Sequence, residues 1–166
     1  NTYLYSTQIT GTTQVSAINT LINGLKANNL WTKMKAVYPF VTDKTLQADM
    51  AAQMKFNLIN PQDSDAAFRL AFSGGWTYST NGAQPNGTNG YADTKLVPST
   101  SLSTSSAHLS FYSRTNSPSG GYTGYELANG HYALITQFQG NKFYPNLEAG
   151  GSYAAVYTST NGLGHF

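Results

Sequence analysis

The sequence predicts a mainly β fold, a sandwich or barrel with an amphipathic helix near the N-terminus and one or two short helices. Three observations predict it. Uncharged polar residues dominate, since 59 of 166 residues are Thr, Ser, Asn or Gln, and twelve more are Tyr, a mixture typical of strands joined by many turns. From residue 76 onward, short alternating runs are separated by Gly-, Pro- and Asn-rich clusters. A clear helical period is confined to a segment near the N-terminus.

That helical period covers residues 12–28. Its apolar side chains recur three or four positions apart and form one stripe: Val15, Ile18, Leu21, Ile22 and Leu25. Thr12 or Thr13 is expected to cap the start, and Asn28-Asn29 to turn the chain out of the helix. The helix is amphipathic, so we expect it to cover an edge or one end of the sheets.

Residues 31–75 are expected to mix a strand with short helices. Apolar and polar residues alternate over 31–41, which predicts a strand, and Pro39 confines it to a sheet edge or a bend. Asp43 is expected to cap a second helix, whose apolar residues are Leu46, Met50 and Met54. Asp63 or Ser64 is expected to start a third helical turn that ends before Gly74-Gly75.

The remaining chain predicts short strands at regular spacing. They cover residues 91–96, 108–115, 122–127, 131–138 and 152–158. Asn129-Gly130 between two of them is the best hairpin signal. In the 108–115 run, Leu109, Phe111 and Ser113 are expected to face the core.

Composition excludes several classes of function. Nine Lys and Arg against seven Asp and Glu give a net charge of +2, and such dispersed cations cannot form a phosphate track, so we expect no nucleic-acid partner. No apolar run reaches the roughly 18–20 residues of a membrane helix, so we expect no membrane insertion. The absence of Cys excludes disulfides, zinc–thiolate sites and thiol catalysis.

An ordered set of segments resembles a known protein family. The segments are residues 17–21 (AINTL), 30–41 (LWTKMKAVYPFV), 56–61 (FNLINP), 65–70 (DAAFRL), 89–94 (NGYADT) and 108–116 (HLSFYSRTN). Together they resemble tailed-phage virion proteins that carry a laminin-G-like, concanavalin-type jelly roll, over roughly residues 12–166. The resemblance implies a jelly-roll β-sandwich, a location in the phage particle, other virion proteins as partners, and a structural or receptor-binding role. It supplies no catalytic residues and no cofactor.

The resemblance also frames the expected domain organisation. Residues 1–11 are expected to form an N-terminal extension and residues 12–166 a single jelly-roll-like domain that is incomplete at its C-terminus. Residues 162–166 look like the opening of a further strand. Because unpaired strand edges favour association, we expect a homo-oligomer.

Catalytic and metal sites are not expected. Sugar hydrolysis needs two carboxyl groups across the bond, whereas Glu126 and Glu148 each stand alone in their segments. Asp63-x-Asp65 is better interpreted as a helix start than as a metal site. The three histidines are more than twenty residues apart and favour ordinary strand-end positions over metal ligation. A jelly-roll glycoside hydrolase or lyase therefore lacks the acids that it needs.

Exposed aromatic residues leave a binding function open. Trp76, Tyr78, Tyr122 and Tyr125 lie beside Gly-rich loops and are candidates for stacking on sugar rings, although most such rings fill a core or cover a neighbouring subunit. The leading hypothesis is a non-enzymatic virion module in the fibre, tail or head, with host-surface glycan as a further partner. The alternative is a carbohydrate-binding module of an adhesin or a secreted enzyme.

Overall fold

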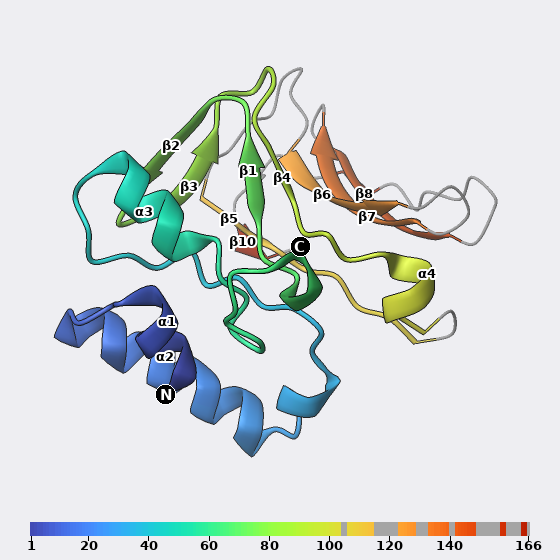
Figure 1. Ribbon diagram of the computed structural model, residues 1–166. Helices are drawn as coiled ribbons and strands as arrows, with labels where there is room; N and C mark the ends of the chain where they lie inside the picture. Colours follow the sequence, from blue (N-terminus) through green and yellow to red (C-terminus); the bar gives the residue numbers. More distant parts are fainter. Residues whose placement is uncertain are drawn as a thin grey trace. The chain divides into compact units, whose positions relative to one another are not determined.

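The chain divides into two compact units, residues 1–95 and 96–166 (Figure 1). The computed structural model describes residues 1–103 and 106–114 and, beyond these, the backbone of strands β6 to β10. Side chains after residue 114, and that of Ser113, lie outside the described part.

The first unit combines helices with short strands. Its helices are α1 (Thr2–Thr7), α2 (Thr12–Ala27) and α3 (Gln47–Met54), with 3-10 turns η1 (Trp31–Lys33) and η2 (Asp65–Ala67). Its strands are β1 (Ala71–Ser73), β2 (Trp76–Ser79), β3 (Gly82–Pro85) and β4 (Tyr91–Asp93). The strands form two antiparallel pairs, β1 with β4 and β2 with β3.

The second unit begins with the short helix α4 (Pro98–Ser101) and is otherwise built from strands where it is described. The strands are β5 (Tyr112–Ser113), β6 (Thr123–Ala128), β7 (Ala133–Gln139), β8 (Lys142–Glu148), β9 (Tyr157–Thr158) and β10 (Gly164–His165). Strands β6 to β9 pair antiparallel in sequence order, and β10 pairs with β5. The hairpin predicted around Asn129-Gly130 therefore connects paired strands, although the turn itself lies outside the described residues.

The predicted jelly-roll β-sandwich is wrong. Residues 1–95 form a small mixed α/β unit whose described strands span only three or four residues and belong to two separate two-stranded sheets. Among the described strands of the second unit, β6 to β9 follow one another as a meander. The apolar residues of 31–59 belong to helices and to chain outside any strand, and they pack either on a core of helices and loops or on the aromatic side of β2, so their pattern does not indicate strands.

The helix predicted from the apolar stripe is confirmed as α2. Its Ile18 is 1% exposed, and Val15, Ile22 and Leu25 pack against the same core. Asn29, just after the helix, has a φ of 56°, the left-handed conformation expected there. The cap is different from the prediction, because Gly11 precedes the helix and makes no side-chain cap.

The partners of α2 also differ from the prediction. Four residues of the predicted stripe pack against Tyr3 and Ile9 from the N-terminal segment and against Phe56 and Leu58, whereas the fifth, Leu21, is 36% exposed and lies outside this core. No sheet residue belongs to this described cluster. Residues 1–11 therefore contribute to a core of helices and loops that α2 closes.

The strand predicted over 31–41 is wrong. Its first residues form η1, and the following extended chain is held by one buried side chain, Asn57. Asn57 Oδ1 accepts from the Val37 N–H at 3.0 Å, and Asn57 Nδ2 donates to the Lys35 carbonyl at 3.1 Å. The Leu58 N–H also donates to the Val37 carbonyl at 2.8 Å. The side chain of Asn57 thus satisfies backbone groups that a neighbouring strand would otherwise satisfy.

Helix α3 rests on strand β2, as Figure 1 shows. Gln47 at its start donates to the Tyr78 carbonyl and accepts from the Tyr78 N–H, both at 2.7 Å. Met50 and Met54 pack with Tyr78 in a second core. Asp43 does not cap this helix, contrary to the prediction, because Leu46 is the N-cap and makes no side-chain bond.

The second unit confirms one side-chain pattern and adds one strand. Leu109 and Phe111 are half-buried while His108, Ser110 and Tyr112 are exposed, as the alternation predicted. Strand β8 was not predicted, and it contains Pro145, a residue that is uncommon inside strands. Among the described residues, no helix has the length and apolarity that crossing a bilayer requires.

Candidate functional site

An aromatic cluster joins β1 to β2 in the first unit. Trp76 and Tyr78 point to the same side of β2 and stack, with ring centroids 6.2 Å apart and planes at 14°. Phe72 of β1 meets both rings edge-on, at 5.0 Å from Trp76 and 5.2 Å from Tyr78. Such edge-to-face contacts stabilise aromatic groups beyond area burial alone. The three rings therefore fix one another in place.

The two predicted residues of this cluster differ in exposure. Tyr78 is 8% exposed and packs on Met50 and Met54, and burial raises the pKa of its hydroxyl. Trp76 is half-buried, and its indole Nε1 donates to the Ser73 carbonyl at 2.9 Å and to the Tyr91 carbonyl at 3.2 Å. The accessible part of Trp76 is therefore apolar, and Tyr78 supports it from the core.

The other two predicted residues lie in the second unit. Tyr125 is in β6, where its backbone pairs with Thr136. Its side chain and the whole of Tyr122 lie outside the described part of the chain. The structure thus brings Trp76 and Tyr78 together, and ligand binding by the four residues stays a prediction.

Two loops interlock beside the aromatic cluster. Asn86 Oδ1 accepts from the N–H groups of Thr88, Asn89 and Gly90 at 3.0–3.1 Å. Asn89 Oδ1 accepts from the Gly75 N–H at 3.1 Å. Gly74 has a φ of 73°, and a Cβ there would clash with the Asn89 carbonyl. The chain between β3 and β4 is therefore locked against the turn between β1 and β2.

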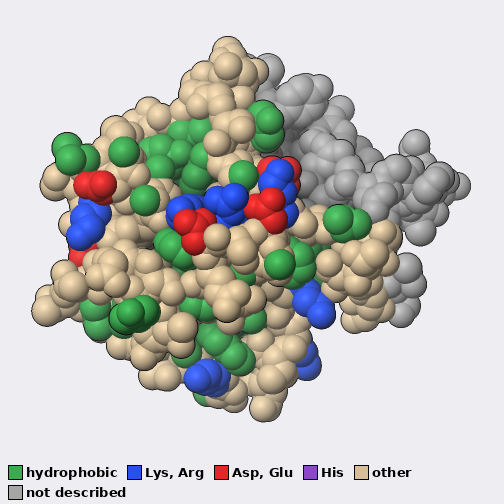
Figure 2. Space-filling view, in the orientation of Figure 1, with side chains coloured by type: hydrophobic (Ala, Val, Ile, Leu, Met, Phe, Trp, Pro, Cys, Tyr) green, Lys and Arg blue, Asp and Glu red, His purple; other side chains and the backbone are tan. Residues whose placement is uncertain are grey.

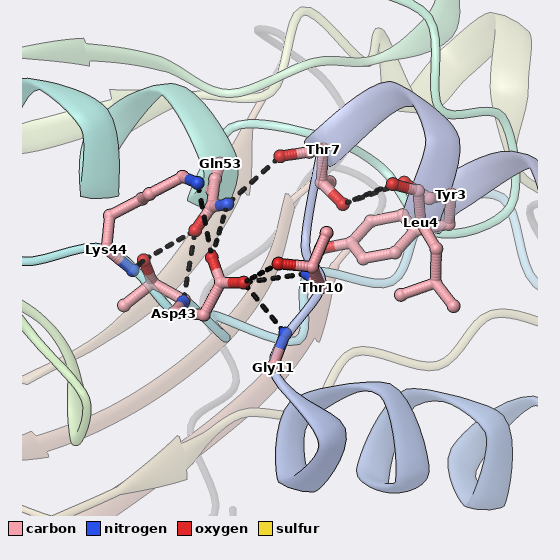
Figure 3. A network of polar contacts seen from close by, with 9 residues as sticks. Tyr3, Leu4, Thr7, Thr10, Gly11, Asp43, Lys44 and Gln53 are labelled. Atoms are coloured by element: carbon pink, nitrogen blue, oxygen red, sulfur yellow. Dashed lines mark hydrogen bonds and ion pairs between the residues drawn. The ribbon is translucent and has the colours of Figure 1, made fainter.

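A carboxylate joins the beginning of α2 to the segment before α3. Asp43 Oδ2 accepts from the Thr10 N–H at 2.7 Å and the Gly11 N–H at 2.9 Å, at the N-terminus of α2 (Figure 3). Burial would raise the pKa of Asp43, but hydrogen bonds from Thr10, Gln53 and Gly11 outweigh it and hold the pKa well below its usual range. Asp43 thus holds the two residues that lead into α2 from a distant part of the sequence.

Gln53 of α3 completes this network. Its Oε1 accepts from Thr42 Oγ1 at 2.6 Å and from the Asp43 N–H at 3.2 Å. Its Nε2 donates to the Thr7 carbonyl at 3.0 Å and to Asp43 Oδ1 at 2.9 Å (Figure 3). We call this network the Asp43–Gln53 clasp, and it ties α1, α2 and α3 together.

A band of alternating charges crosses one face of the first unit, with hydrophobic side chains beside it (Figure 2). Lys55 Nζ lies 2.6 Å from Asp63, Arg69 lies 3.1 Å from Asp63 and 3.0 Å from Asp65, and Lys95 Nζ lies 2.8 Å from Asp93. We call these six residues the charge row. The hydrogen bond from Lys55, together with the Lys55 and Arg69 charges, lowers the pKa of Asp63 despite partial burial.

Sequence reasoning missed the charge row. Asp63-x-Asp65 was interpreted as a helix start, and Asp65 does open η2. The four-residue spacing of Asp65 and Arg69 is a sequence signal for their ion pair. Lys55 and Lys95 are brought to the row by the fold, and no local signal marks them.

The pKa shifts of the described aspartates all have one direction. The three described aspartates with a shifted pKa, Asp43, Asp63 and Asp93, are all shifted downward, whereas a general acid needs the opposite shift. Within the described residues, no group of three His, Cys, Asp or Glu side chains is placed to hold a metal ion.

Comparison with protein-family models, curated proteins and solved structures finds no match to this chain.

Proposed function

We propose that this chain is a non-enzymatic structural module of a bacteriophage particle, in its fibre, tail or head. In this proposal the chain is held in an oligomer, contacts other virion proteins and presents a surface to the host cell.

The observation that supports the proposal is the ordered set of segments that resembles phage virion proteins. Five of the six segments lie in the first unit, where they contribute much of its buried framework: Ile18, Trp31, Val37, Val41, Phe56, Asn57, Leu58, Ala67 and Leu70. These segments therefore concern the framework of the first unit, and they carry no catalytic residue.

The internal hydrogen bonds of the polar side chains in the first unit support the same proposal. Asn57, Gln53 and Asp43 direct their hydrogen-bonding atoms at the chain's own backbone and side chains. Such satisfied internal networks give rigidity, which a particle component needs.

Immunogold electron microscopy of purified particles tests the proposal. An antibody against this chain is expected to label one fixed position on the particle. Particles from a host–phage pair that lacks the gene serve as the control and should stay unlabelled. Label confined to the host cytosol would contradict the proposal.

The second candidate function is a carbohydrate-binding module of an adhesin or a secreted enzyme. The half-exposed Trp76 favours it, because internal hydrogen bonds and two neighbouring rings hold an apolar face in a fixed position. A preorganised ring loses little entropy when a sugar stacks on it.

A glycan array with full-length variants tests this candidate. Trp76→Ala is expected to abolish glycan binding by the first unit and Tyr122→Ala any glycan binding by the second, whereas Tyr5→Ala, which removes a ring that is 79% exposed on α1, should leave binding unchanged. Circular dichroism and a melting curve for each variant separate loss of the site from loss of the fold. Glycan binding that survives both substitutions would remove these residues from the candidate site.

A further inference from the structure

The outward side of β4 and the residues after it combine an aromatic ring with charges. Tyr91, Asp93 and Lys95 are exposed, whereas Ala92 and Thr94 between them are half-buried. Alternate residues of a strand lie on one side at intervals of roughly 6.6 Å, which places Tyr91 and Asp93 on the same side of β4. Lys95 follows the strand with a φ of 57° and reaches this side through its ion pair with Asp93 at 2.8 Å. Tyr91 is 62% exposed, although its carbonyl is engaged by the Trp76 indole. The backbone of Tyr91 is therefore anchored while its ring faces solvent.

This side of β4 continues into the rest of the charge row. The hydrogen bond to Asp93 raises the pKa of Lys95, and Asp65 and Tyr91 add smaller electrostatic contributions. Ala71 of β1 pairs with Asp93 of β4, so Arg69, two residues before Ala71, and Lys95, two residues after Asp93, lie beyond the same end of this strand pair. In turn Asp65 pairs with Arg69, which pairs with Asp63. The ring of Tyr91 thus lies on the side of β4 that carries Asp93, a member of this polar track.

The charges of this track cancel. Lys55, Arg69 and Lys95 each pair with a carboxylate of Asp63, Asp65 or Asp93. An anionic ligand therefore gains no net attraction from the row and must compete with its carboxylates. A neutral ligand meets no such penalty.

Hydrogen-bonding capacity remains on the paired groups. Arg69 has five N–H donors, and its ion pairs use Nε and one terminal nitrogen. The hydrogen bond from Arg69 to Asp65 engages Oδ1, and a carboxylate has about four acceptor positions. Sugar hydroxyls both donate and accept, so they match a surface that offers ionised donors beside ionised acceptors.

A protein partner fits this surface less well. The buried centre of a protein interface is depleted of charged residues, because removing ionic groups from water costs more than their pairing returns. The side chains of Asp63, Asp65 and Asp93 are 49%, 58% and 46% exposed. A glycan can bind them while they stay partly hydrated.

We propose that Tyr91 and the charge row form a binding site for a neutral glycan. The ring of Tyr91 stacks on one sugar, and Asp93, Asp65 and Arg69 exchange hydrogen bonds with hydroxyl groups of the neighbouring sugars. The inference rests on the proposed presentation of a surface to the host and assigns a site to it.

Glycan-array and calorimetric binding of the full chain test this site with neutral and sialylated oligosaccharides as probes. Tyr91→Ala is expected to weaken binding of a neutral glycan by roughly tenfold, the effect of losing about one stacked ring, while Tyr91→Phe retains most of it. Arg69→Gln should also weaken binding, and Tyr5→Ala is the matched control. Binding should change little between low and high salt.

Several outcomes would overturn the site. The first is that both Tyr91→Ala and Arg69→Gln leave the binding of neutral glycans unchanged. The second is that the chain binds sialylated glycans alone. The third is that a virion protein binds at this face and no glycan does. Dependence on Trp76 with no dependence on Tyr91 would favour the second candidate function and contradict this site. Particle labelling without glycan binding would also contradict it and leave the structural proposal standing. Tyr91-dependent glycan binding without particle labelling would contradict the structural proposal alone.

Discussion

Buried polar side chains of the first unit differ in how many of their donors and acceptors have a hydrogen-bond partner. Asn57 uses both lone pairs and both N–H groups, since its Oδ1 also accepts from Ile59 and its Nδ2 also donates to Ala67. The hydroxyl of Tyr3 is buried without a hydrogen-bond partner among the described residues, and burial raises its pKa. A buried polar group without a hydrogen-bond partner lowers the free energy of unfolding. Removing a buried polar group that is fully hydrogen-bonded also lowers it, because the partners of that group are left unpaired.

These two residues give opposite expectations for substitution. Tyr3→Phe should keep or raise the free energy of unfolding, by up to about 1 kcal/mol, because it removes an unpaired hydroxyl. Asn57→Leu should lower it by about 3 kcal/mol or more, because backbone groups of Lys35, Val37, Ile59 and Ala67 lose their partner. Urea denaturation of each variant measures both changes. A large loss for Tyr3→Phe would show that its hydroxyl has a partner.

At the scale of elements, the Asp43–Gln53 clasp holds three helices through one carboxylate. Asp43→Ala should lower the free energy of unfolding by about 2 to 3 kcal/mol, because two N–H groups at the start of α2 and Gln53 Nε2 lose an ionised acceptor. Asp49→Ala, an exposed carboxylate in the first turn of α3, is the control and should cost less than about 1 kcal/mol. Equal losses in the two variants would contradict the role of the clasp.

Two glycines, one in helix α2 and one in the turn between β1 and β2, differ in whether a side chain would fit. Gly24 lies inside α2, where an added Cβ meets no atom within 4 Å, so Gly24→Ala should stabilise the protein by about 0.5 to 1 kcal/mol. Gly74→Ala should destabilise it, because the backbone there has a positive φ and a Cβ clashes with the Asn89 carbonyl. Thermal denaturation of the pair gives shifts of opposite sign. A loss of stability in Gly24→Ala would mean that something packs on that side of α2.

Elements that depend on residues near in the sequence could be predicted, whereas elements that depend on contacts between distant residues could not. Helix α2 follows from its own apolar period. The alternation of 31–41 does not mark one packed side, because Val37 and Val41 pack on the first core whereas Phe40, with a φ of 53°, packs on the second. The role of Asn57 in holding this segment has no local signal. The same spacing that placed Trp76 and Tyr78 on one side of β2 could not show that Phe72 would join them. Within the charge row, Asp65 and Arg69 are predictable from their spacing, whereas Lys55 and Lys95 arrive through tertiary structure.

At the scale of the whole molecule, carboxylates make stability depend on pH. Asp43, Asp63 and Asp93 have folded-state pKa values below their ordinary 3.8. The unfolded state therefore binds more protons in acid, and stability decreases as the pH falls below about 4. Above that value the contribution of the three groups is complete.

The three lowered pKa values have different causes, so salt should affect them to different extents. Asp63 is held by the partly exposed cations Lys55 and Arg69, and Asp93 by both the ammonium and the backbone N–H of Lys95, whereas the hydrogen bonds to Asp43 come from uncharged backbone N–H groups and the Gln53 amide. Salt screens the ion pairs of Asp63 and Asp93 more than it weakens the hydrogen bonds to Asp43. In high salt, the loss of stability in acid should therefore remain in the wild type and shrink in Asp43→Asn. Urea midpoints measured across this pH range at two salt concentrations check the expectation. A pH profile that Asp43→Asn leaves unchanged in high salt would contradict it.

The interlocked loops between residues 74 and 90 decide where a reporter can be placed in this protein. An epitope or a fluorophore attached within 86–90 would separate Asn86 and Asn89 from the backbone that they hold. The tight turn between Ser79 and Gly82 joins two paired strands at its outer end, and Thr80 and Asn81 are not packed there. A tag inserted between those two residues would let the chain be followed in living cells without disturbing the aromatic cluster or the ring of Tyr91.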